Sequence, residues 1–108
     1  MSKVIQPTRG ESLYIWRKRR QYSQPQAAEE YGVHIDVYRD WERDVRTKDQ
    51  PRRQLGQLKL SELCVLMRRR AGLTQRELAG QMDITRLWVV QMEAGDAPAD
   101  RLREFWGV

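Results

Sequence analysis

The chain has 108 residues, enough for one small domain or for two very small ones near the lower limit for an independent core. Its net charge of +5 and isoelectric point of about 9.8 favour a polyanion as partner. A single cysteine, Cys64, excludes an internal disulfide, a single histidine, His34, gives no zinc set, and no apolar run is long enough for a signal peptide or a membrane span. We therefore expect a cytoplasmic protein with no metal, cofactor or membrane partner.

Start and stop signals divide the first part of the chain into three predicted helices. The first opens with the Thr-x-x-Glu capping box of residues 8–11 and ends in the cationic run 17–20, which suits a helix C-terminus. The second opens with the Ser-x-x-Gln pattern of residues 23–26 and ends at Gly32, where a left-handed residue makes a tight turn. The third spans roughly residues 34–43.

Residues 47–59 contain Lys48, Pro51, Arg52, Arg53 and Gly56, and we expect this segment to link a first unit, residues 1–46, to a second unit, residues 60–108.

The second unit repeats the order of predicted helices. Its first helix starts near Ser61, and its second opens with the Thr-x-x-Glu pattern of residues 74–77. Asp83 must then build the left-handed turn, before a third helix over residues 85–94. Apolar residues within 102–106 predict a short terminal helix that returns to the core. No stretch alternates like a strand, so the predicted fold class is all-α.

The two predicted units are copies of one pattern. An offset of 51 residues aligns residues 12–44 with residues 63–95 without a gap. The identical pairs are Arg17 and Arg68, Arg19 and Arg70, Gln24 and Gln75, Ala28 and Ala79, and Glu42 and Glu93. A repeat of this length indicates one supersecondary unit written twice, here a helix-turn-helix.

The second copy carries residues of defined type at fixed spacing. They are Gly72, Leu73, Thr74, Gln75, Leu78, Ala79, Ile84, Thr85, Val89, Met92, Glu93 and Gly95. This pattern resembles the helix-turn-helix of the phage repressor and Cro family, also called XRE-type. The first copy resembles the family at fewer positions and departs from it at Pro25 and Asp44. The resemblance covers most of the chain as two tandem units.

The resemblance implies that the second helix of each unit lies over the DNA backbone and that the third enters the major groove. It implies a contact with a phosphate, or with a base near it, for Gln75 and Gln24. The resemblance also implies that the first residues of the third helix, and one residue a turn later, contact base edges. These are Thr85, Arg86, Leu87 and Gln91 in the second copy, and His34, Ile35, Asp36 and Asp40 in the first.

The two sets differ in their chemistry. Arg86 suits a guanine edge, Gln91 an adenine edge and Leu87 a thymine methyl group. In the first copy, Asp36 and Asp40 repel phosphates, although a carboxylate can accept a hydrogen bond from the cytosine amino group. We therefore expect the second copy to carry most of the sequence readout.

The family also pairs an arginine of the first helix with the glutamate that ends the third. The resemblance therefore implies internal ion pairs between Arg17 and Glu42 and between Arg68 and Glu93, which removes two arginines from the candidate DNA surface.

Other basic residues are candidates for contact with backbone phosphates. They are Lys18, Arg19, Arg69 and Arg70 of the first helices, and Arg39 of the first copy's third helix, which partly offsets its aspartates.

Double-stranded DNA is the expected partner, and transcriptional regulation, most simply repression by a protein of a phage or mobile element, is the expected function. Two units can read adjacent major grooves, or one can read DNA while the other forms a homodimer. The alternatives are a protein-interaction adaptor or inhibitor using Leu87, Trp88 and Val90, and an architectural or excision factor. No serine, aspartate or glutamate has a base at a recognisable spacing, so we predict no catalytic residue and no enzyme.

Overall fold

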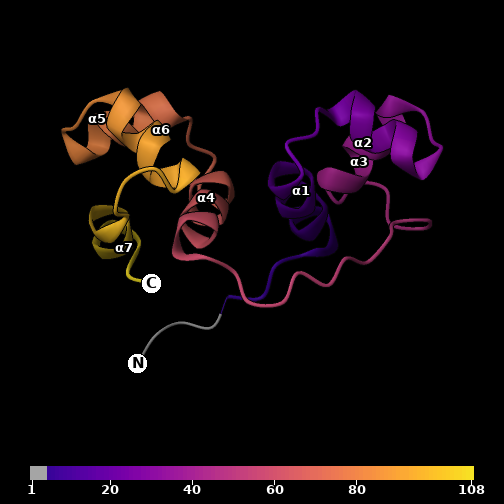
Figure 1. The fold of residues 1–108 in the computed structure, drawn as a ribbon, viewed down its shortest axis with the longest axis horizontal. Helices are drawn as coiled ribbons and strands as arrows, with labels where there is room; N and C mark the ends of the chain where they lie inside the picture. The colour runs from indigo at the N-terminus through magenta and orange to yellow at the C-terminus, as the bar shows by residue number, and fades with distance from the viewer. Residues whose placement is uncertain (1–4) are drawn as a thin grey trace. The chain divides into compact units, whose positions relative to one another are not determined.

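The computed structural model describes residues 5–108, and all regular secondary structure within this range is helical (Figure 1). The helices are α1 (Arg9–Arg19), α2 (Gln24–Tyr31), α3 (Ile35–Glu42), α4 (Leu60–Arg70), α5 (Gln75–Met82), α6 (Arg86–Ala94) and α7 (Asp100–Trp106). The prediction of an all-α fold is confirmed for this part of the chain. Among these helices, none combines the length and the apolar character that crossing a membrane requires.

Contacts between residues divide the chain into two compact units. The first unit, Gln6–Gln57, contains α1 to α3, and the second unit, Leu58–Val108, contains α4 to α7. Ile5, predicted to belong to the first unit, groups with the second. Residues 1–4, with which the predicted first unit begins, lie outside the described residues. Most of the predicted linker, residues 47–57, groups with the first unit.

Side-chain caps set where the helices begin. At Thr8, Ser23 and Thr74, the hydroxyl oxygen accepts the backbone N–H three residues on, and the side chain at that third position accepts the cap residue's own N–H. These three capping boxes are the predicted ones. At the start of α4, Glu62 Oε1 accepts the backbone N–H of Lys59 at 2.9 Å. Each bond satisfies a donor that a helix start leaves without a partner inside the helix.

Left-handed backbone residues recur at the same offset of 51 as the sequence repeat. Among residues 5–108, three non-glycine residues have positive φ, namely Gln21, Asp44 and Asp83. Their counterparts at that offset are Gly72, Gly95 and Gly32, which also have positive φ. A left-handed conformation is strained for most residues with a side chain, so each pair marks a turn that the fold requires. The predicted left-handed turns at Gly32 and Asp83 are confirmed.

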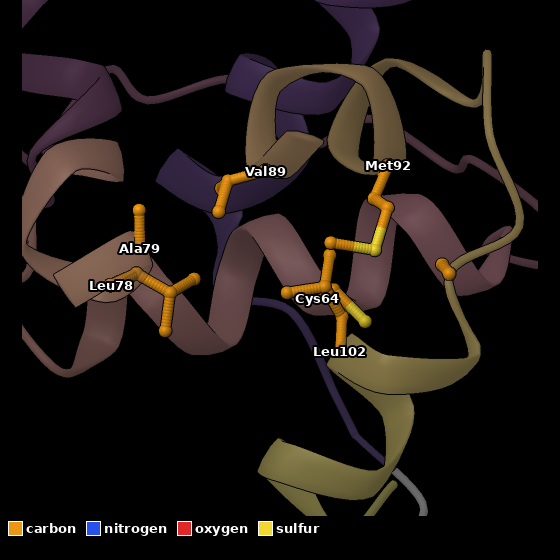
Figure 2. Packing of buried hydrophobic residues seen from close by; sticks show 7 residues of the cluster. Cys64, Leu78, Ala79, Val89, Met92 and Leu102 are labelled. Carbon is orange, nitrogen blue, oxygen red and sulfur yellow. The ribbon is translucent and has the colours of Figure 1, made fainter. Parts of the chain in front are cut away.

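Each unit has its own hydrophobic core. The first unit buries Leu13, Trp16, Ala27, Ala28, Tyr38 and Trp41. The second buries Cys64, Leu78, Ala79, Val89, Met92, Ala99 and Leu102, and Figure 2 shows the side chains of Met92, Cys64 and Leu102 meeting between α6, α4 and α7. Burial raises the pKa of the Cys64 thiol to about 11, so this residue is a neutral member of the core.

The two cores are closed by different segments. In the second unit, α7 packs against α4 and inserts the fully buried Leu102. The first unit has no corresponding helix among its described residues, and a segment without regular secondary structure, residues 51–56, takes this place. There Leu55 packs against the core, and the Arg53 guanidinium carbon lies 4.2 Å from the ring centroid of Trp16. Part of the predicted linker thus belongs to the first unit.

The start of α1 lies against the end of α3, and the side chain of Asp44 joins the two. The N–H of Gly10 donates to Asp44 Oδ1 at 2.9 Å, and Gln50 Nε2 donates to the same oxygen at 2.8 Å. A Cβ atom at Gly10 would lie 2.6 Å from the carbonyl oxygens of Trp41 and Glu42. The absence of a side chain at Gly10 therefore sets how closely the two helices approach.

A pair of glycine substitutions tests this contact. We expect Gly10→Ala to destabilise the first unit by about 1–3 kcal/mol, because backbone oxygens cannot move aside as a flexible side chain can. Gly80 also lies in a helix, but a Cβ atom there would have no neighbouring atom within 4 Å. Gly80→Ala should therefore stabilise by about 0.5–1 kcal/mol. Urea unfolding of the full chain measures both, and equal effects of the two variants would contradict this account.

Candidate nucleic-acid interface

The start of α6 presents the predicted base-reading residues to solvent. Thr85 caps the helix, and its Oγ1 accepts the backbone N–H of Trp88 at 3.2 Å. Val89 and Met92 are fully buried in the second unit's core, which fixes the rotation of the helix about its axis. The residues that remain exposed at its start and one turn on include Arg86, Leu87 and Gln91. These three side chains offer a guanidinium, an apolar group and an amide.

The start of α3 presents a different surface. His34 Nδ1 accepts the backbone N–H of Asp36 at 3.1 Å and so caps this helix. Ile35, predicted to face base edges, is half-buried and packs against the first unit's core. Asp36 is exposed and Asp40 is half-buried, while Arg39 Nη1 lies 3.7 Å from Asp36 Oδ1. The outward surface of α3 therefore carries two aspartates, one of which lies beside Arg39.

In the first unit, the predicted ion pair is present. Arg17 Nε donates to Glu42 Oε2 at 2.7 Å, and its Nη2 donates to the other carboxylate oxygen at 3.2 Å. Arg17 Nη1 also donates to the carbonyl oxygen of Tyr22, in the turn before α2. Burial opposes the charge of Arg17, but the hydrogen bond and the Coulomb attraction of Glu42 hold its pKa above the usual value.

The second unit contains the same arrangement. Arg68 Nε donates to Glu93 Oε2 at 2.8 Å, and Arg68 Nη1 donates to the carbonyl oxygen of Leu73 at 2.9 Å. The side chains of Arg68 and Glu93 are 13% and 4% exposed, against 9% and 2% for the pair in the first unit. Both predicted ion pairs are therefore enclosed within their units.

In each unit a glutamine also donates a hydrogen bond to the glutamate of the ion pair, a contact that was not predicted from the sequence. Gln24 Nε2 donates to Glu42 Oε1 at 3.2 Å, and Gln75 Nε2 donates to Glu93 Oε1 at 3.0 Å. We call each set of three residues, Arg17, Gln24 and Glu42 or Arg68, Gln75 and Glu93, an Arg–Gln–Glu cluster. Its signal lay in the repeat, because all three members are identical between the copies. The glutamines assigned to DNA thus have an internal partner.

The predicted phosphate-contacting residues occupy varied surroundings. Arg19 Nη1 donates to the carbonyl oxygen of Leu55 at 2.8 Å, which ties α1 to the segment that closes the first core. Lys18 Nζ lies 5.5 Å from the ring centroid of Tyr14. Arg70 is exposed and Arg69 is half-buried.

The three candidates for protein contact are not equally exposed. Leu87 is 65% exposed and Trp88 is 39% exposed, while Val90 is half-buried. The guanidinium carbon of Arg101, from α7, lies 4.9 Å from the centroid of the Trp88 ring. This contact joins two helices that the sequence analysis did not connect.

Comparison of the chain with protein-family models, with curated proteins and with solved structures gives no match. Within residues 5–108, no group of three or more histidine, cysteine, aspartate or glutamate residues is arranged to hold a metal ion.

Truncation of a cluster glutamate tests the role of the buried charge. We expect Glu93→Ala to destabilise the second unit by about 3 kcal/mol, because it leaves Arg68 enclosed without its counter-ion. Glu42→Ala should act similarly in the first unit. Glu104→Ala is the control, since Glu104 is exposed on α7 and should change stability by less than about 0.5 kcal/mol. Thermal unfolding of the full chain measures all three. A Glu93→Ala variant as stable as the control would contradict the assigned role.

Proposed function

We propose that this chain is a sequence-specific, double-stranded DNA-binding protein of the repressor and Cro-like helix-turn-helix type. It regulates transcription, in the manner of a phage or mobile-element repressor that occludes a promoter. The observation that carries the proposal is the exposed start of α6, where Arg86, Leu87 and Gln91 project from a helix that the core and a cluster hold in place. The net charge of +5 supports a polyanionic partner.

In this proposal α6 enters the major groove of duplex DNA, with α5 across the backbone. Arg86 donates to the acceptors of a guanine, Gln91 pairs with an adenine, and Leu87 contacts the methyl group of a thymine. The helix must be held rigidly, because a side chain can discriminate between bases only if its backbone keeps a fixed position relative to the base edges. The buried Val89 and Met92 provide that rigidity.

The two units have different tasks in the proposed complex. Asp36 at the exposed start of α3 places negative charge where a groove-binding helix would meet phosphates, so α3 is a poor reader of bases. Residues 1–54 nevertheless carry 12 lysines and arginines against 8 acidic residues. The first unit is therefore assigned to steering and backbone contact, and the second unit to base readout.

A protein-interaction adaptor is the second candidate function. The specific observation in its favour is the exposure of Leu87 and Trp88, two large apolar side chains, at the start of α6. Arg101 lies over the Trp88 ring, however, so this surface combines apolar area with a cation. The adaptor hypothesis predicts a Trp88-dependent protein contact and no preference among DNA sequences.

Matched substitutions in α6 and α3 test the proposal. With a duplex enriched from a random pool by the parent protein, Arg86→Ala and Gln91→Ala should each weaken specific binding by about 1–3 kcal/mol and weaken binding to a scrambled duplex much less. Asp36→Ala is the control in α3, because Asp36 is exposed whereas Ile35, the direct counterpart of Arg86, packs against the core.

Fluorescence anisotropy with both duplexes measures these affinities, and thermal unfolding confirms that each variant is folded. An equal loss of discrimination from Asp36→Ala and Arg86→Ala would contradict the assignment of readout to the second unit. A parent protein that enriches no sequence would contradict the proposed function.

A further inference from the structure

The exposed tryptophan of α6 supports an arginine from another helix. The Arg101 guanidinium carbon lies 4.9 Å from the Trp88 ring centroid, within the range of a cation–π contact. Both residues are exposed. Within residues 5–108, no hydrogen bond or ion pair engages Arg101, so its N–H groups are available to a ligand.

A guanidinium placed over an aromatic ring keeps its hydrogen-bonding capacity. The ring attracts the positive charge, while the N–H donors of the guanidinium point outward toward other acceptors. The indole has few rotatable bonds, so it holds the arginine at a low cost in side-chain entropy. An arginine that is held in place by an aromatic ring, with its N–H donors free to bind, suits an anion with two adjacent oxygen atoms, such as a phosphate.

The position of this pair relates it to the proposed DNA-binding surface. The backbone N–H of Trp88 donates to Thr85 Oγ1, the cap of α6, which places the indole in the first turn of that helix. The same turn carries the exposed Arg86 and Leu87. The Arg101 charge, although it comes from α7, is therefore held beside the start of the helix that is proposed to enter the groove.

We propose that Arg101 donates to a backbone phosphate of duplex DNA beside the base pairs that α6 reads, and that Trp88 is the positioning residue for this contact. The inference rests on the proposed function and deepens it. It gives Trp88 a role in the DNA complex, where its exposure alone suggested a protein partner. Because a phosphate is present at every nucleotide, the contact adds affinity without sequence preference.

The same helix supplies a matched control. Arg103 is also exposed on α7, but its Nε donates to the carbonyl oxygen of Val108 at 3.1 Å, and no contact with Trp88 is present. Arg101→Gln and Arg103→Gln remove the same charge from one helix. A general effect of net charge would act on both variants alike, whereas a specific phosphate contact separates them.

The experiment measures the affinity of the full chain for the enriched duplex and for a scrambled duplex over a series of salt concentrations. Arg101→Gln should weaken binding to both duplexes about tenfold at low salt and reduce the magnitude of the log–log salt slope by about 0.9. Arg103→Gln should leave affinity and slope at the parent values. Thermal unfolding verifies that the variants are folded.

Substitutions of the tryptophan test its positioning role. Trp88→Ala should reproduce the loss of slope seen with Arg101→Gln, and the double variant should lose no more than either single variant. Trp88→Phe should recover much of the lost affinity, because phenylalanine retains an aromatic face.

The outcomes separate this inference from the proposed function. If the parent discriminates between the duplexes but Arg101→Gln keeps the parent slope, the phosphate contact is wrong and the proposed function stands. If Trp88→Ala abolishes discrimination but preserves the slope, Trp88 reads bases and its positioning role is wrong. If the parent binds both duplexes equally, the proposed function itself is overturned.

Discussion

The two Arg–Gln–Glu clusters are the interaction on which the arrangement of each unit depends. In the second unit, Glu93 near the end of α6 accepts from Arg68 of α4 and from Gln75 at the start of α5, and Arg68 also reaches the turn carbonyl of Leu73. One enclosed carboxylate thus joins three helices. A buried charge is costly unless its partners satisfy it, so the helices have one relative arrangement that meets this requirement. The exposed residues at the start of α6 acquire a fixed position as a result.

The Arg–Gln–Glu cluster is the same in both units, but the surfaces of α3 and α6 that it holds in place differ in their chemistry. The buried positions of α3 and α6 correspond at the offset of 51, with Tyr38 matching Val89 and Trp41 matching Met92. Outward positions do not have to fill a core, and there the aligned residues differ: Asp36 of α3 corresponds to Leu87 of α6. The closing segments also differ, because α7 completes the second core and a segment without regular secondary structure completes the first. Function in such a scaffold is determined by the surface residues.

The sequence was most informative where local chemistry decides the structure. Capping boxes and the left-handed turn at Asp83 were predictable, because each depends on residues at short spacing. The two ion pairs were expected only from the resemblance to the repressor and Cro family, and both are present. Two features of the candidate site were not predicted. The bond from Gln75 to Glu93 was visible only as a repeated identity, and polar residues at a helix start have several possible partners. The contact of Arg101 with Trp88 depends on how α7 packs against α4, which no local pattern specifies.

The central claim is that α6 of the second unit reads DNA sequence, and chemical-shift mapping of the labelled full chain tests it most directly. Backbone amide resonances are recorded with the enriched duplex and with a scrambled duplex of equal length. The account predicts that the largest shifts fall on residues 85–91 and that these shifts depend on the sequence of the duplex. Shifts confined to the basic residues of the first unit, and identical for both duplexes, would contradict it, because a cationic protein without base readout gives that result.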